Sequence, residues 1–194
     1  MAAPRYSKIF RQTKETSINC DLNLDGRNIN ISTPSGFFSH MLTALATYAG
    51  WGLTLEVTGD IQVDYHHTVE DTGIVLGKAL SESLGDFSSH ARFGSVLVPM
   101  DDALAEVALD AGRRPYLHFE AIFPQPQTRD FDFCLVEEFF RALTTHAGFT
   151  LHLTGRRGQN SHHLAEALFK GMGMACRRAL APREGGTLST KGVL

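Results

Sequence analysis

The sequence is poor in the features that mark several large classes of protein. It has only three cysteines among 194 residues, and none of them forms a Cys-x-x-Cys pair. This argues against a disulfide-stapled secreted domain and against a zinc ribbon. No apolar run approaches the length of about 18 residues that a membrane-spanning helix needs, and no signal-peptide pattern of charged and then apolar residues is found. We therefore expect a soluble protein of the reducing cytoplasm.

A strong excess of one charge is also missing. The 18 Lys and Arg residues nearly balance the 21 Asp and Glu residues, which leaves a formal net charge of -3. Such a chain has no general positive field to attract nucleic acid or an anionic membrane, so neither is expected as a partner. A local basic pocket is compatible with this balance. The hydrophobic content of 43% suits one domain, or two halves that share a core.

The sequence does contain a metal-competent pattern that occurs twice. His66, His67 and Glu70 form His-His-x-x-Glu, and the pattern recurs 96 residues later over residues 162–166. In a helix the first His and the Glu are four positions apart and share a face, whereas adjacent histidines diverge by roughly 100°. One ion is therefore not expected to take both histidines of a motif. The pattern favours two metals, each held by a His and a Glu of one motif and a crossing His of the other.

The first half of the chain alternates between strand and helix patterns. Apolar and polar residues alternate over residues 16–24, which is typical of a strand with one buried face. Helical spacing predicts a helix over residues 37–49, closed by a glycine and followed by a strand at about 53–57. An amphipathic helix is predicted over residues 66–84, and it carries the first motif in its opening turn.

The second half follows the same course. Strands are expected within residues 93–122, then a helix around 136–143, a short strand at 151–153 and a final helix that reaches 179. Residues 44–55 and 142–153 also share seven of twelve positions. These matches indicate an internally duplicated α+β domain, each half a small, mostly antiparallel sheet packed against two helices. The predicted units are residues 1–90 and 91–181, followed by a flexible C-terminal tail over 182–194.

Metal binding competes with a simpler explanation of the motifs. A single His-x-x-x-Glu on a helix is usually a surface ion pair, but packing seldom requires adjacent histidines at two matching repeat positions. Imidazole and carboxylate donors without thiolate suit Mn, Fe or Zn. His40 and His152 are candidates to complete the shells. The eight predicted ligands, four for each of two metals, are His40, His66, His67, Glu70, His152, His162, His163 and Glu166.

A few basic residues stand near the predicted strands and in the tail. Arg92 precedes a strand, Arg114 belongs to an Arg-Arg-Pro sequence, and Ser189 and Lys191 lie near the end of the chain. Each of them alone is most often a solvated residue. Together, the hydroxyl, the ammonium and the guanidinium groups could clamp a phosphate. The spacing leaves both interpretations open.

Many ordered segments match one known family. They lie at residues 13–16, 23–26, 36–42, 64–71, 92–95, 98–101, 112–117, 160–163, 166–167 and 189–194, and they include Gly-Phe-Phe-Ser-His-Met-Leu, Asp-Tyr-His-His-Thr-Val-Glu-Asp and the closing Ser-Thr-Lys-Gly-Val-Leu. Over nearly its whole length the chain resembles imidazoleglycerol-phosphate dehydratase of histidine biosynthesis. The resemblance implies a duplicated α+β fold, a homo-oligomeric shell of 24 subunits, and active sites between subunits with two Mn²⁺ each, other divalent metals being possible.

The resemblance also implies a reaction and residue roles. D-erythro-imidazoleglycerol phosphate would lose water to give imidazole-acetol phosphate, with the substrate imidazole bound to metal. All eight predicted donors would be ligands, Glu15 would transfer a proton and contact the substrate, and the tail would close on the substrate phosphate. The implied phosphate clamp is Arg92, Arg114, Ser189 and Lys191. The implied catalytic residues are Glu15, His67, Glu70, His163 and Glu166. These chemistries suit the side chains, since Arg forks and Lys point charges bind phosphate and a carboxylate shuttles protons.

The chain departs from the family at four positions beside the expected site, which are Ser39, Ala44, Tyr48 and Tyr65. No implied ligand is lost by these departures, but ligand orientation and some substrate contacts are affected. Two alternatives to the dehydratase remain. One is a hydrolase that uses a water bound to two metals, and the other is an inactive paralogue in which metal only holds an oligomer together.

Overall fold

The computed structural model describes residues 5–186 and 188–191. The elements of the first half are β1 (Tyr6–Gln12), β2 (Thr16–Asn23), β3 (Ile29–Ser32), α1 (Gly36–Ala49), β4 (Gly52–Gly59) and α2 (His66–Leu84). Those of the second half are β5 (Phe93–Met100), β6 (Ala103–Asp110), β7 (Tyr116–Glu120), α3 (Cys134–Ala147), β8 (Thr150–Arg157) and α4 (Ser161–Ala179). The order of strands and helices is the same in both halves.

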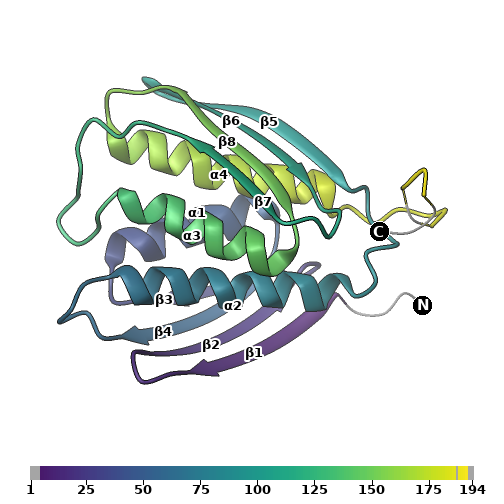
Figure 1. The fold of residues 1–194 in the computed structure, drawn as a ribbon, viewed down its shortest axis with the longest axis horizontal. Coiled ribbons are helices and arrows are strands. Elements are labelled where there is room, and N and C mark those ends of the chain that lie inside the picture. The colour runs from purple at the N-terminus through teal and green to yellow at the C-terminus, as the bar shows by residue number, and fades with distance from the viewer. Residues whose placement is uncertain (1–4, 187, 192–194) are drawn as a thin grey trace.

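The two halves form two sheets with the helices between them (Figure 1). The strand order is β1-β2-β4-β3 in one sheet and β5-β6-β8-β7 in the other. In each sheet three strands are antiparallel neighbours, and the fourth, β3 or β7, pairs in parallel with β4 or β8. The prediction of a duplicated α+β fold with mostly antiparallel sheets and two helices per half is confirmed.

Two strands of the first sheet were not predicted from the pattern. In β1 the large apolar side chains of Tyr6 and Phe10 point outward, while Ser7 is buried and donates its hydroxyl to the carbonyl of Ala79. The apolar alternation that reveals a half-buried strand is therefore inverted in β1. The strand β3 has only four residues, which is too short for a periodic signal.

The helix starts place the histidine motifs. Asn160 caps α4, and its side chain accepts hydrogen bonds from the backbone N–H groups of His162 and His163. At the start of α2, Asp64 accepts a 2.7 Å hydrogen bond from the backbone N–H of His66. Asn160 is the N-cap of α4, whereas Asp64 precedes Tyr65, the N-cap residue of α2; both side chains satisfy N–H groups that have no partner inside the helix. Both motifs consequently lie in the first turn of a helix whose beginning is fixed by a side chain.

The helices pack in matched pairs, α2 on α3 and α4 on α1. A Cβ atom at Gly77 of α2 would lie 2.6 Å from the carbonyl oxygen of Leu143 and 2.9 Å from Cβ of His146 in α3. Gly173 of α4 meets Leu45 and Tyr48 of α1 in the same way. The residues contacted on α1 and α3 are 98 positions apart, which is the offset between the repeated segments 44–55 and 142–153. The two glycines are 96 positions apart, which is the offset between the two histidine motifs. The two helix pairs are therefore structural counterparts.

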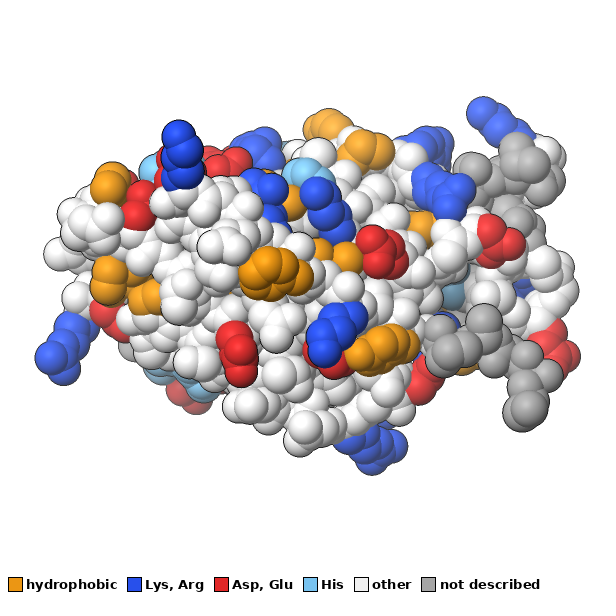
Figure 2. Space-filling view, turned by 90° about the horizontal axis from the view of Figure 1, so that it is seen from below, with side chains coloured by type: hydrophobic (Ala, Val, Ile, Leu, Met, Phe, Trp, Pro, Cys, Tyr) orange, Lys and Arg blue, Asp and Glu red, His pale blue; other side chains and the backbone are white. Residues whose placement is uncertain are grey.

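The outer surface is consistent with a folded domain whose apolar residues lie mainly between the sheets. Figure 2 views the side of the first sheet, where apolar side chains are scattered singly among polar ones. None of the helices in the described part of the chain is long and apolar enough to cross a membrane. Of the predicted tail, residues 187 and 192–194 lie outside the described residues.

We predict that Gly77→Ala destabilises the protein. The added methyl group cannot fit against the Leu143 carbonyl without separating α2 from α3, and overpacking of this kind costs about 1–3 kcal/mol. Chemical denaturation of the variant measures the loss. Gly36→Ala is the control, since a Cβ there meets only Asp130, at 3.7 Å. Equal stability of the two variants would show that the close approach of the helices is not required.

Candidate metal and phosphate sites

One cluster of metal-competent side chains lies between α1 and α4. The Nε2 atoms of His40 and His162 are 3.4 Å and 3.2 Å from Oε2 of Glu166. One donor atom from each of the three residues lies within 4.8 Å of the others. His40 and His162 are partly exposed and Glu166 is buried, so the cluster opens to the surface. The structure brings these three predicted ligands together, and their donors suit a divalent cation.

Glu166 has a second partner. Its Oε1 atom lies 2.9 Å from Nζ of Lys170, one helical turn later. Burial would raise the pKa of Glu166, but the hydrogen bond and charge of Lys170, with a smaller contribution from His40, lower it below the ordinary value. Glu166 is therefore an anion whose two oxygens face different groups, with Oε2 directed to the histidines.

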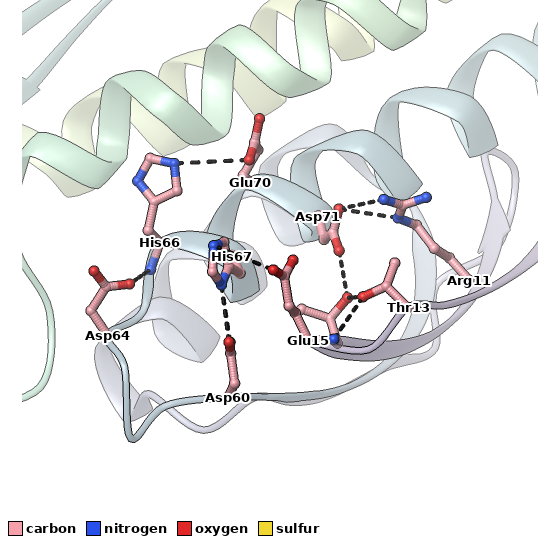
Figure 3. A network of polar contacts seen from close by, with 10 residues as sticks. Arg11, Thr13, Glu15, Asp60, Asp64, His66, His67, Glu70 and Asp71 are labelled. Carbon is pink, nitrogen blue, oxygen red and sulfur yellow. Dashed lines mark hydrogen bonds and ion pairs between the residues drawn. The ribbon is translucent and has the colours of Figure 1, made fainter.

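The corresponding group in α2 is more open. Nε2 of His66 lies 3.8 Å from Oε2 of Glu70, and both side chains are nearly half exposed. Figure 3 shows them on the same side of the first turns of α2. The neighbouring Asp71 points the other way and is buried, accepting hydrogen bonds from Arg11 of β1 and Thr16 of β2. This contact ties the motif-bearing turn of α2 to the first sheet.

The second histidine of each motif is oriented by an aspartate. Nδ1 of His67 lies 3.0 Å from Asp60, and Nδ1 of His163 lies 2.7 Å from Asp102. An imidazole that donates its Nδ1–H to a carboxylate keeps the Nε2 lone pair for a metal. On that side, Nε2 of His67 is 3.9 Å from Glu15 (Figure 3). The structure therefore places Glu15 beside His67.

The contacts between the aspartates and the histidines also shift the pKa values of His67 and Asp102. The hydrogen bond with Asp60 raises the pKa of His67 above its ordinary value, against a smaller opposing effect of burial. The hydrogen bond from His163 holds the pKa of Asp102 well below its usual range, and the backbone N–H groups of Gln159 and Asn160 lower it further. Sequence reasoning missed both aspartates, because they lie in turns and meet the histidines only in the fold.

His152 is placed elsewhere. Its side chain lies on the outer face of β8, between the inward-facing Leu151 and Leu153. The ring centroid is 5.3 Å from that of His118 on β7. It borders a shallow depression of about 370 Å³ that Asp110 also lines. The structure thus places His152 with His118 and not in contact with either His-and-carboxylate group.

The internal repeat points to a different residue, which sequence reasoning overlooked. The offset of 98 positions that aligns residues 44–55 with 142–153 also aligns His40 with Glu138. His40 projects from α1 toward the motif of α4, and α3 packs on α2 through the matching glycine contact described above. The repeat therefore predicts that Glu138, which is half-buried, takes on the α2–α3 pair the position that His40 has on the α1–α4 pair. The repeat that aligns these two positions is present in the sequence itself.

Two of the departures from the family pattern make contacts near these clusters. The ring of Tyr48 lies 5.5 Å from Nζ of Lys170, a cation–π contact. The hydroxyl of Ser39 accepts a 3.1 Å hydrogen bond from the backbone N–H of Thr33, which joins the start of α1 to the end of β3. Tyr48 therefore contacts the lysine that pairs with Glu166, and Ser39 fixes the start of the helix that carries His40.

The two arginines of the predicted phosphate clamp contact the same aspartate, Asp110. Arg92 contacts Asp110 through Nε at 2.7 Å and Nη2 at 3.0 Å, and Arg114 approaches the same carboxylate at 3.1 Å. Nη1 of Arg92 donates to the carbonyl of Leu188 in the tail. Burial would raise the pKa of Asp110, but the two arginines lower it. Further along the tail, the hydroxyl of Ser189 accepts from the backbone N–H of Lys191. Leu188 of the tail therefore lies against Arg92, one of the predicted clamp arginines.

Backbone geometry fixes Arg92 at this place. Its φ of 75° is left-handed, which is uncommon for a residue with a side chain. The conformation is held by hydrogen bonds from the Arg92 N–H to the carbonyl of Ala179 and from the Ala111 N–H to the carbonyl of Arg92. Ala179 ends α4, whereas His162 lies in its first turn. At a rise of 1.5 Å per residue the clamp and the histidine cluster are roughly 25 Å apart in one chain.

We predict that Asp60→Asn lowers the pKa of His67 in the metal-free protein, because the carboxylate that favours the imidazolium is removed. NMR titration of the His67 ring measures the change. Since Asp60 raises the folded-state pKa above 6.5, its stabilising effect is present below that pH and disappears as the pH rises through the raised value. The variant should therefore lose more stability at acid pH than at alkaline pH.

Asp64→Asn is the matched control for this experiment. Asp64 is the last and smallest of the causes that raise the pKa of His67, and its carboxylate caps the backbone of His66. Its substitution should move the pKa of His67 less than Asp60→Asn does. An unchanged His67 titration in Asp60→Asn would contradict the orienting hydrogen bond.

Comparison with known proteins gives a consistent result. The profile of the imidazoleglycerol-phosphate dehydratase family matches residues 33–176. The chain is 51% identical to the imidazoleglycerol-phosphate dehydratase of Acidiphilium cryptum over 98% of this chain and 99% of that one, and 49% identical to that of Methanosarcina mazei over 98% and 100%. Its fold is similar to the crystal structure of the Staphylococcus aureus enzyme, with a TM-score of 0.84, 38% identity and coverage of 91% of this chain and 99% of that chain.

A second solved structure, of the Pyrococcus furiosus protein in complex with (S)-C348, gives a TM-score of 0.85 at 39% identity and covers 96% of this chain and 100% of that one. Family profile, full-length relatives and fold agree over the region that contains both histidine motifs and both clamp arginines. The chain belongs to the imidazoleglycerol-phosphate dehydratase family, a family of hydro-lyases of histidine biosynthesis.

Proposed function

We propose that this chain converts D-erythro-imidazoleglycerol phosphate to imidazole-acetol phosphate and water, using two divalent metals for each site. The observation that carries the proposal is the pair of His-and-carboxylate clusters at one end of the helices, combined with an arginine clamp at the other. Membership of the dehydratase family supports the same reaction. A cytoplasmic location fits the three cysteines, all of which are free.

The donors present in the chain fit the proposed metals. Imidazole and carboxylate groups gather without thiolate at the α1–α4 cluster, a donor set that suits Mn²⁺ and related divalent ions. His40, His162 and Glu166 would hold one ion, and His66, Glu70 and Glu138 the other. His67 and His163, with Nε2 available, would each add a crossing ligand. Glu138 takes the place first given to His152, so the count of eight donors is kept.

Different residues of the chain perform the separate steps of the proposed reaction. When bound, the metals supply Lewis acidity that polarises the substrate imidazole and so favours loss of a carbon-bound proton. Glu15 accepts that proton, and the hydroxyl of the neighbouring carbon leaves with a proton as water. The resulting enol rearranges to the ketone. Arg92 and Arg114 bind the phosphate bidentately, and Ser189 and Lys191 close over it from the tail.

The distance between the two parts supports an active site shared by subunits. Arg92 lies at the end of α4 and His162 at its start, roughly 25 Å apart. A small substrate with three carbons between imidazole and phosphate is far too short to reach from one to the other. We therefore propose that the clamp of one copy faces the metal cluster of another, within a closed homo-oligomer of 24 subunits.

The reaction is tested by incubating the manganese-loaded protein with imidazoleglycerol phosphate. We expect a new ketone, seen by its enolate absorbance in alkali, and no free phosphate. Release of inorganic phosphate would instead identify a two-metal hydrolase, and absence of both products would identify an inactive paralogue. Glu166→Gln should lower the rate at least about tenfold, because loss of even a group that only supports a metal ligand typically costs about 10–100-fold in activity.

The shared site predicts that two inactive variants rescue each other. Glu70→Gln fails at the metal and Arg92→Ala at the phosphate, so their co-assembly leaves about a quarter of the sites with two intact parts when chains mix at random. Activity of the hybrid should recover to that fraction of the wild-type rate.

The control mixes Arg92→Ala with Arg114→Ala. Both arginines contact Asp110 within one chain, so every clamp in that hybrid keeps one defect and activity stays low. If Glu70→Gln and Arg92→Ala give no more activity together than apart, the site is not divided between copies in this way.

A further inference from the structure

The two helix pairs share a backbone arrangement but differ in the chemistry of their donors. At the repeat position of His40, the second half has Glu138. At the repeat position of Lys170, the first half has Ile74. The matched packing at Gly77 and Gly173 shows that these differences are substitutions within one geometry, since the helices approach each other in the same register in both pairs.

These substitutions change the charge of the two donor groups. The α1–α4 group combines two imidazoles with Glu166, whose charge is offset by Lys170 at 2.9 Å. To the α2–α3 group the repeat assigns one imidazole, from His66, and the carboxylates of Glu70 and Glu138. Counting carboxylates and the lysine, the first group is neutral and the second carries two negative charges.

We propose that the two metals of this chain are held in unequal sites, an imidazole-rich site between α1 and α4 and a carboxylate-rich site between α2 and α3. The proposal rests on the two-metal site proposed above and assigns each ion a different selectivity. Imidazole favours Zn²⁺, Ni²⁺ and Co²⁺, whereas carboxylate suits Mn²⁺ and Mg²⁺. The crossing histidines His67 and His163 add one imidazole to each site and leave the difference unchanged.

The charge of each site and the type of its donor atoms favour the same difference in metal selectivity. In the α1–α4 site, Lys170 draws electron density from Glu166 and repels a cation, so binding there relies on the imidazoles. In the α2–α3 site, two carboxylates attract any divalent ion, including those with weak affinity for nitrogen donors. Zn²⁺ is therefore expected to displace Mn²⁺ first from the α1–α4 site.

The test follows release of Mn²⁺ by electron paramagnetic resonance while buffered free Zn²⁺ is raised over protein loaded with two Mn²⁺. We expect two phases of one Mn²⁺ per chain each, with midpoints separated by at least about tenfold in free Zn²⁺. Initial loading with fewer than two Mn²⁺ would refute the two-metal site itself. Loading with two followed by release in one phase would refute only the inequality of the sites.

Variants of the proposed ligands assign each phase of Mn²⁺ release to one of the two sites. Glu138→His should lower the free Zn²⁺ concentration at the midpoint of the second phase of Mn²⁺ release, so that this phase merges with the first. His40→Glu should raise the midpoint concentration of the first phase toward that of the second. Glu138→Gln, which keeps the side-chain shape, should weaken Mn²⁺ in one site only. If these changes leave both midpoints in place, Glu138 and His40 do not hold the metals.

Two control variants test whether side chains near Glu138 bind the metal in its place. Glu137→His changes the adjacent residue, which is paired with Arg141, and should preserve both phases. Cys134 lies one turn before Glu138 and offers the thiol most able to bind Zn²⁺ there. Cys134→Ser should also preserve both phases, whereas a shift of the second midpoint would show a thiolate ligand and overturn the carboxylate-rich assignment.

Discussion

The close approach of helix backbones at Gly77 and Gly173 is the contact on which the candidate site depends. Each glycine lets a motif-bearing helix, α2 or α4, rest directly on the backbone of α3 or α1. Because the contact is made by backbone atoms, it fixes the separation and the register of the pair more firmly than flexible side chains would. The position of His40 over His162 and Glu166 follows from that register.

Orientation of the remaining histidines comes from outside the helices. Asp60 follows β4 and Asp102 lies in the turn between β5 and β6, so the two outer sheets supply the carboxylates that turn His67 and His163. The buried contact of Asp71 with Arg11 adds a third link between helix and sheet. The helix layer therefore provides the donors, and the sheets determine which nitrogen each donor presents.

Duplication explains both the similarity and the difference of the two halves. A repeat that retains its glycine contacts keeps its backbone, and other side chains of the helix pairs are then free to diverge. Glu138 and Lys170 are such divergent positions. The same freedom applies to the far end of the molecule, where only the second half carries the pair of arginines that meets Asp110.

The sequence by itself determined the local features. The periodic pattern over residues 66–84 located α2 with the bounds that the structure has, and the repeated His-His-x-x-Glu motif and the identities over 44–55 and 142–153 revealed the duplication. These signals are readable because helix periodicity and repeated residues depend on neighbours in the chain. The inverted pattern of β1 was missed, since its buried serine reflects a contact with α2 while its aromatic residues Tyr6 and Phe10 face outward.

The tertiary structure decided what lies far apart in the chain. It placed His152 on the outer face of a sheet, paired His163 with Asp102, and joined Arg92 to Asp110 and to the tail. Sequence spacing carries no information about which face of a strand meets which helix once several elements pack together. The position of the His-and-carboxylate groups and of the two arginines at opposite ends of α4 therefore follows from the folded chain alone.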